Sequence, residues 1–234
     1  MDDDTHQPHR KGKRTIAGQI AEGLRARILS GSLEPGAKLN LERLRQEYAV
    51  SLSSLREAIM RLSSDGLIEI EEQRGYRVSP ISPGNLAEVT ELRMKLEPLA
   101  LRKAIRNGGL DWETNVMASL YRLNHTARDP KDQASIETWE IAHNAFHDAL
   151  IARCDMPVLS TFYRTLMNMN DRYRRLFSRI HAEQRDLAQE HTAIAQAAVA
   201  RDEDKAAKLL ARHIEKTSAA LQATLRDQLP QVSQ

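Results

Sequence analysis

The sequence predicts a mainly α-helical protein that contains one short β-hairpin and divides into two domains. Aromatic residues make up only 4% of the 234 residues, and the chain has 10 Gly and 8 Pro, which disfavours a β-sandwich or a β-barrel. Apolar residues recur at helical spacing along most of the chain. One stretch around Ile70 instead alternates apolar and polar residues, as a half-buried strand does.

The composition also limits the class of protein. The 34 Lys and Arg nearly balance the 32 Asp and Glu, so nucleic-acid binding would need a local basic patch. The single cysteine, Cys154, excludes an intrachain disulfide framework and a Cys-rich zinc module. No apolar run approaches the roughly 20 residues that span a bilayer, and the polar start lacks the apolar segment of a secretory signal. We therefore expect a cytoplasmic protein with no membrane partner.

Residues 1–14 are polar, with an acidic start followed by basic residues. Such a segment has nothing to bury, so we expect a disordered basic tail that is either solvated or in contact with phosphates.

Three helices follow the tail. The first begins after Thr15 and has an apolar stripe that ends before Gly31. Asn40 is a suitable N-cap for the second, and Ser51 is a suitable N-cap for the third. Gly66 ends the third helix as a C-cap.

A hairpin comes next, with strands at residues 67–71 and 76–78. Ile68 and Ile70 are two positions apart, so both are expected on the buried face of the first strand. Three helices followed by a two-stranded hairpin are the layout of a winged helix-turn-helix, which we predict over residues 15–80.

The second domain is predicted to be entirely helical. Ser, Pro and Gly mark a linker at residues 81–84, and the bundle then covers residues 85–229 with six or seven helices. Helices are predicted near 85–106, 112–127, 132–153, 157–179, 183–200 and 203–226.

The third helix of a helix-turn-helix lies in the major groove, with its N-terminal residues near the base edges. Candidate DNA-binding residues lie at this helix end, on the preceding helix and at the hairpin tip: Arg43, Arg45, Ser51, Ser53, Ser54, Arg56, Arg74 and Gly75. Charge alone would favour ordinary surface residues, because residues 1–80 hold 13 Lys and Arg against 12 Asp and Glu. The order of the elements, three helices followed by a hairpin, is what favours DNA binding.

The stretches PGAKL, VSLSSLREAIMRLSSDGLIEI and RGYRV occur in this order within residues 35–78. In sequence and spacing they resemble the winged helix of the GntR transcription regulators. Many members of that family have an arginine for base contact directly after the Val-Ser of the turn, and here this position is Leu52. The resemblance implies the family's mode of DNA binding, with a base preference at this position that does not carry over.

Four histidines form the second candidate site. His143 and His147 are four positions apart and share one face of a helix, whereas His191 and His213 lie on two later helices. Neutral imidazoles that converge from three helices suit Zn or Ni, but sequence order leaves open whether they converge or are separate structural histidines. The zinc-protease pattern fails, because no Glu follows His143.

Residues 85–226 resemble the FCD ligand-binding domain of the FadR subgroup, through ELRMKLE, FH, EH and HI at positions 91–97, 146–147, 190–191 and 213–214. The resemblance implies a divalent metal held by His147, His191 and His213. His143 stands where metal-binding members have an Asp, and an all-nitrogen site would favour Zn or Ni. The alternative is that the histidines hydrogen-bond an effector without a metal.

The same resemblance implies a small carboxylate effector beside the metal. A buried carboxylate is best matched by an arginine, which binds it through two charge-assisted hydrogen bonds. Arg93 matches the family's pocket arginine, and Arg172 and Asn144 are further candidates.

We therefore predict a homodimeric transcription regulator that binds a palindromic double-stranded operator and is released from it by a small organic acid. Two alternatives stay open. One is a metal-dependent hydrolase or lyase that uses the histidines, although no carboxylate base stands beside the His pair and we expect no enzyme. The other is a constitutive DNA-binding protein whose bundle only dimerises.

Overall fold

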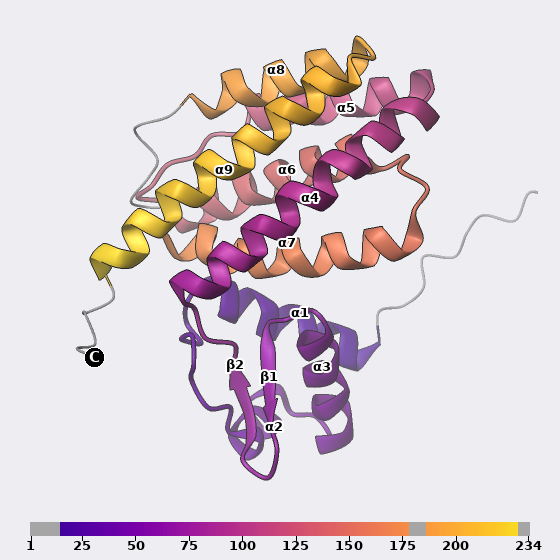
Figure 1. Ribbon diagram of the computed structural model, residues 1–234. Coiled ribbons are helices and arrows are strands. Elements are labelled where there is room, and N and C mark those ends of the chain that lie inside the picture. Colours follow the sequence, from indigo (N-terminus) through magenta and orange to yellow (C-terminus); the bar gives the residue numbers. More distant parts are fainter. Residues whose placement is uncertain (1–14, 178–185, 229–234) are drawn as a thin grey trace, which may run out of the picture.

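The computed structural model describes residues 15–177 and 186–228; the predicted basic tail lies outside the described residues. The described chain forms a small N-terminal domain below a helical bundle (Figure 1). The N-terminal domain has three helices and one hairpin in the predicted order: α1 Ile16–Leu29, α2 Leu41–Tyr48, α3 Leu52–Ser64, β1 Ile68–Glu71 and β2 Gly75–Val78. The predicted winged helix-turn-helix architecture is confirmed.

Side-chain caps start the three helices where the sequence predicts them. Thr15 Oγ1 accepts a hydrogen bond of 3.1 Å from the backbone N–H of Gly18. Asn40 and Ser51 cap α2 and α3 in the same way, with side-chain oxygens 3.0 and 3.1 Å from the backbone nitrogens three residues on. The apolar stripes of these helices then meet in one core around Leu24 and Leu55, both fully buried.

The wing is antiparallel, with Ile68 opposite Val78. Its turn uses the left-handed conformation at Gln73 and Gly75, with φ of 60° and 98°. The expectation for Ile70 was wrong: this side chain is 49% exposed, whereas Ile68 is buried, because only the start of β1 lies over the helical core.

The segment before α2 also pairs with the wing, which the sequence pattern did not indicate. Lys38 forms a single antiparallel bridge with Arg77, and backbone hydrogen bonds join Ala37 to Val78. This extra pairing fastens the PGAKL segment to the hairpin.

The bundle follows with six described helices: α4 Pro83–Asn107, α5 Leu110–Asn124, α6 Gln133–Ile151, α7 Pro157–Phe177, α8 Leu187–Val199 and α9 Glu203–Gln228. The predicted linker is shorter than expected, because Ser82 caps α4 and residues 83–84 already belong to its first turn. Helices α4 and α9 pack along most of their lengths, and α7 lies on the side of the bundle that faces the winged helix (Figure 1).

Helix α7 joins the two domains through side-chain hydrogen bonds. Arg25 of α1 donates to Asn168 Oδ1 at 2.8 Å, and Arg172 donates to the carbonyl oxygen of Ser79 at 2.7 Å. Within the bundle, Tyr173 also holds the start of α4, donating its hydroxyl hydrogen to Asn85 Oδ1 at 2.7 Å. The DNA-binding domain is therefore tied directly to one helix of the bundle.

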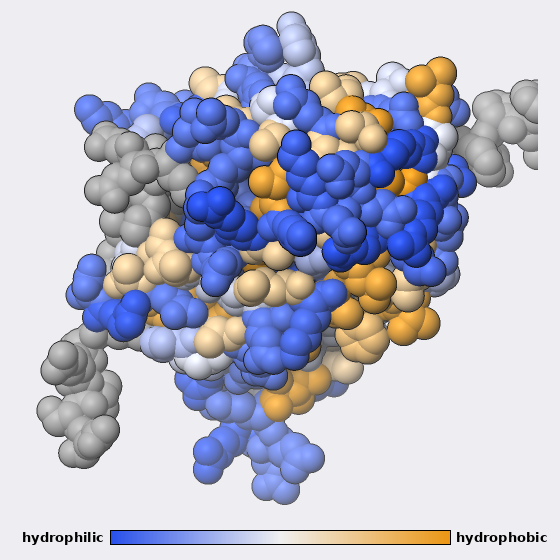
Figure 2. Space-filling model, turned by 45° about the horizontal axis from the view of Figure 1, so that its top comes forward, coloured by the Kyte–Doolittle hydropathy of each residue, from blue (hydrophilic) through white to orange (hydrophobic). Residues whose placement is uncertain are grey.

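The face of the molecule in Figure 2 is mainly hydrophilic and is interrupted by small hydrophobic patches. Among the described helices, none combines the length and the hydrophobicity needed to cross a membrane.

Candidate metal centre and nucleic-acid interface

The four predicted histidines converge inside the bundle. His143 and His147 lie one turn apart on α6, His191 comes from α8 and His213 from α9. One nitrogen from each ring can be chosen so that all four atoms lie within 4.8 Å of one another. All four side chains are buried, with exposures between 1% and 5%. The convergence that sequence order left open is therefore present in the fold.

The four imidazole rings surround a common centre, and each lies beside two others. Ring centroids are 4.5 Å apart for His143 and His147, and 4.7 Å apart for His191 and His213. The two remaining sides, from His147 to His213 and from His143 to His191, measure 5.3 and 5.1 Å. Such spacing places the nitrogens around a common centre.

Hydrogen bonds around the rings suit a metal site. Nδ1 of His213 lies 2.9 Å from Oε2 of Glu190. A carboxylate can only accept, so neutral His213 has its proton on Nδ1 and its lone pair on Nε2. Nε2 of His147 is buried with no hydrogen-bond partner. An unsatisfied buried nitrogen is costly, and a divalent cation would satisfy it.

Burial also determines the charge of His143 and His147. Desolvation holds the pKa of both His143 and His147 well below the usual value for histidine, and the nearby Arg174 guanidinium lowers the pKa of His143 further. Both rings are therefore neutral at pH 7, which is the form that ligates metals. The donor set fits Zn or Ni, which accept imidazole nitrogen.

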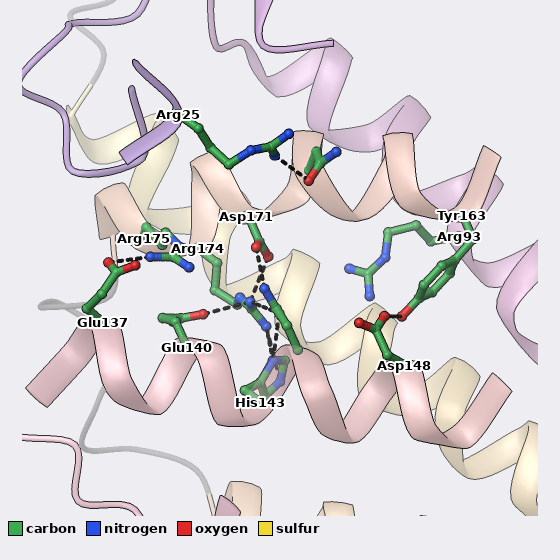
Figure 3. Close-up of polar contacts among 12 residues, drawn as sticks. Arg25, Arg93, Glu137, Glu140, His143, Asp148, Tyr163, Asp171, Arg174 and Arg175 are labelled. Atoms are coloured by element: carbon green, nitrogen blue, oxygen red, sulfur yellow. Dashed lines mark hydrogen bonds and ion pairs between the residues drawn. The ribbon is translucent and has the colours of Figure 1, made fainter. Parts of the chain in front are cut away.

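A buried charged network, which no sequence pattern predicted, adjoins His143. Arg174 of α7 donates from Nη2 to Asp171 Oδ1 at 2.7 Å and pairs with Glu140 Oε2 at 2.6 Å (Figure 3). The Nη1 atom of Arg174 contacts His143 itself. Glu140 is fully buried, and burial raises its pKa above the usual range. The only signal in the sequence was the i, i+3 spacing of Asp171 and Arg174.

Of the three predicted effector residues, two lie near the histidines. Arg93 of α4 is 4% exposed and donates from Nε to Glu97 at 2.5 Å. Its guanidinium points between α6 and α7 toward the Tyr163–Asp148 pair, in which the tyrosine hydroxyl donates at 3.1 Å (Figure 3). Asn144 belongs to the charged network, because its Oδ1 accepts from Arg174 Nη2 at 2.7 Å.

Arg172 lies elsewhere, which corrects its assignment to the effector pocket. Its guanidinium is bonded to Ser79 at the junction with the winged helix, and burial lowers its pKa. Arg174, two positions on, is the arginine that reaches the histidines.

The candidate DNA-binding residues lie on α2, at the start of α3 and in the wing. Arg43, Arg56 and Arg74 are exposed, and their side chains form no hydrogen bond or ion pair with any residue that the structure describes. Their guanidinium groups are thus available to phosphates or bases. Ser53 is exposed at the start of α3, and Gly75 is exposed in the wing.

Three of these candidates have structural partners. Arg45 is bound by Glu42 of its own helix, with Nη2 2.6 Å from the carboxylate. Ser51 caps α3, and its hydroxyl is 3.0 Å from that of Ser54. These side chains would have to exchange partners to bind DNA.

Comparison with known proteins agrees with this arrangement. Residues 16–78 match the family of bacterial regulatory proteins called the gntR family, and residues 88–216 match the FCD domain. The HTH-type transcriptional regulator BphR of Paraburkholderia xenovorans is 35% identical over 206 residues, which covers 86% of this chain and 83% of BphR. The HTH-type transcriptional repressor GlaR of Escherichia coli is 29% identical, covering 80% of this chain and 87% of GlaR.

Solved structures share the fold. Escherichia coli McbR/YncC superposes with a TM-score of 0.73 at 21% identity, covering 90% of this chain and 98% of that one. A GntR regulator from a Rhodococcus species gives 0.70, also at 21% identity, and covers 88% and 97% of the two chains. The chain therefore belongs to the GntR family of bacterial regulatory proteins, with an FCD domain as its second domain, and is a DNA-binding transcriptional regulator rather than an enzyme.

Proposed function

We propose that this regulator is a repressor that releases its operator when a small carboxylate binds in the FCD domain beside a divalent metal. The observation that supports this most is the buried cluster of four histidines in a bundle tied to the winged helix. The names of relatives point the same way, since GlaR and the gluconate operon regulator of Bacillus subtilis are called repressors.

The histidine cluster would hold Zn or Ni. A bound ion of this kind would offer coordination positions to carboxylate oxygens of the effector. Arg93 would hold the effector's carboxylate, because its Nε is engaged by Glu97 while its terminal nitrogens bond to none of the residues that the structure describes. The nearby Tyr163 would limit the size of the effector, since it is buried and its hydroxyl is held by Asp148.

On DNA, α3 would enter the major groove and the wing would lie along the adjacent backbone. Arg56 and Ser53 would contact bases and phosphates from the start of α3, with Arg43 positioning the domain and Arg74 acting from the wing. Ser51, Ser54 and Arg45 would contribute after exchanging their present partners, and Gly75 would let the wing backbone approach closely.

A homodimer would place two such heads on a palindromic operator. The face formed by α5 and α6 supports a dimer interface, because Tyr121 and Ile141 are 64% and 60% exposed there. Tyr121 stacks on His125 with ring centroids 4.0 Å apart, and this pair separates two shallow grooves with mostly apolar linings.

Elemental analysis of the full-length protein tests the metal part of the proposal. About one equivalent of Zn or Ni per chain is expected, with loss of the metal in His147→Ala. A His125→Ala variant is the matched control, because His125 is a histidine of the same bundle outside the cluster. Metal absent from both wild type and control, and not taken up from Zn²⁺ or Ni²⁺ solutions, would contradict this part.

Measurements of operator binding test the second part of the proposal, the release of DNA by a small carboxylate. An operator is first selected from a random double-stranded DNA pool, and affinity is then measured at fixed salt with and without succinate, malate and citrate. At least one of these acids should weaken binding about fivefold or more, a typical coupling between two sites. The double variant Arg93→Gln/Glu97→Gln, which leaves neither buried charge unpaired, should remove the response while leaving DNA affinity without acid unchanged. An affinity that no acid alters would instead support a constitutive DNA-binding protein.

A further inference from the structure

Arg174 and His143 make a contact that bears on the ligand set of the metal. Nη1 of Arg174 lies 3.1 Å from Nε2 of His143, and it is closer still to Nδ1. Both side chains are buried, with exposures of 7% and 4%. The guanidinium therefore covers the edge of the ring that carries its nitrogens.

The hydrogen-bonding chemistry of the two groups prevents His143 from binding Arg174 and a metal at the same time. A guanidinium has five N–H donors and no acceptor, so it needs a lone pair on the imidazole. Neutral imidazole has one nitrogen with a lone pair and one with a hydrogen. The single lone pair of His143 can thus accept from Arg174 or bind a metal, but it cannot do both.

The surroundings hold Arg174 in this position. Its Nη2 atom is fixed by Asp171 at 2.7 Å, Asn144 at 2.7 Å and Glu140 at 2.6 Å. These three partners come from α6 and α7 and hold the Nη2 end of the guanidinium, while Nη1 contacts His143. Moving Arg174 away would leave buried Asp171 without its cation and Glu140 with only the more distant Arg128, 4.0 Å away, which is costly.

We propose that Arg174 keeps His143 out of the metal's ligand set, so that the ion is held by His147, His191 and His213 alone. The inference rests on the metal site of the proposed function and makes it more specific. Arg174 is then a positioning residue that lowers metal affinity and leaves a coordination position open. His143 becomes a ligand only in a protein without this guanidinium.

Two spectroscopic comparisons test the ligand set. Visible absorption of Co²⁺ reports the number and type of its ligands, so His143→Phe should leave the spectrum of the Co²⁺-loaded protein unchanged. In Arg174→Gln the Co²⁺ spectrum should differ from wild type. Adding His143→Phe to that variant should restore the wild-type spectrum.

Metal affinity gives a second readout. Competition with a chromophoric chelator should show that Arg174→Gln binds Zn²⁺ about tenfold more tightly than wild type, since one competing charged hydrogen bond is lost. In the His143→Phe background the same substitution should change affinity less than about threefold. Arg175→Gln is the matched control for charge, because Arg175 is the next residue on α7 and pairs with Glu137 outside the cluster.

Arg174→Gln removes the nearer cation of Glu140 and leaves only Arg128 at 4.0 Å, so circular dichroism is needed to check that the bundle stays folded. The variant Glu140→Gln/Arg174→Gln keeps the charge balance and gives the same expected affinity gain. A change in the wild-type Co²⁺ spectrum on His143→Phe, or an affinity gain that does not need His143, would overturn the role of Arg174 alone. A wild-type protein that takes up neither Zn²⁺ nor Co²⁺ would overturn the metal site itself, and this inference with it.

Discussion

Arg172 donates a hydrogen bond of 2.7 Å from Nη1 to the carbonyl oxygen of Ser79, the first residue after the wing. Two positions further along α7, Arg174 contacts His143 in the centre of the bundle. Within a single turn, one helix thus touches the residue that follows the last strand of the DNA-binding domain and the candidate effector site. A rotation of α7 on effector binding would displace both contacts together, which gives the two sites a physical connection.

Arg172→Gln should loosen the junction between the domains. The variant loses a charge-assisted hydrogen bond, worth about 1.5–3 kcal/mol, that holds the chain between β2 and α4. Hydrogen exchange at residues 79–82 should therefore speed up, and operator affinity should respond less to any active acid. Arg164→Gln provides the comparison, since Arg164 is exposed on the same helix. Equal exchange rates in both variants would count against the role of Arg172.

Gly66→Ala should be more damaging than Gly36→Ala. Both glycines have left-handed backbones, with φ of 73° and 77°, so each substitution costs about 1–2 kcal/mol from the backbone alone. A Cβ on Gly66 would also come within 2.5 Å of Met169 on α7, whereas one on Gly36 would meet nothing within 4 Å. Denaturant unfolding should show the difference.

A second substitution tests the clash between a Cβ at position 66 and Met169 of α7. Met169→Ala should recover part of the stability lost in Gly66→Ala and none of that lost in Gly36→Ala. If both glycine variants unfold at the same denaturant concentration, α7 does not pack against this turn as the structure has it.

Glu97→Gln should destabilise the bundle strongly. The Glu97 carboxylate is buried and binds Arg93 at 2.5 Å, so its removal leaves an unpaired buried cation at a cost of about 3–5 kcal/mol. Glu91→Gln is a control on the same helix with the same i, i+4 spacing, because the Glu91–Lys95 pair is about two-thirds exposed. That variant should lose less than about 0.5 kcal/mol. Similar losses in thermal unfolding would mean that Arg93 finds another partner.

Ile141→Asp should shift the protein from dimer to monomer. A charge placed among the exposed apolar side chains of α5 and α6 would have to be desolvated in the proposed interface. Val158→Asp tests specificity, since Val158 is 72% exposed on α7, away from that face. Light scattering should give a monomer for the first variant and a dimer for the second. A dimer in both cases would place the interface on another surface.

Local chemistry was enough to predict the order and kind of the elements. Asn40 and Ser51 are N-caps because their side-chain oxygens bond backbone N–H groups only three residues away, an interaction contained in the sequence itself. The apolar stripes of α1 and α3 likewise follow from helical periodicity. Spacing alone also put His143 and His147 on one face of α6.

Only the tertiary structure determined which residues of α7 contact the winged helix and which contact the histidines. Residues 170–174 are buried in succession, because this part of the helix lies between the bundle and the winged helix. A helix buried on all sides has no exposed face, so periodicity cannot tell which polar residue points which way. The sequence therefore could not distinguish Arg172, bound to Ser79, from Arg174, bound to His143. Their orientation depends on which elements pack on each side of α7, and those elements come from distant parts of the chain.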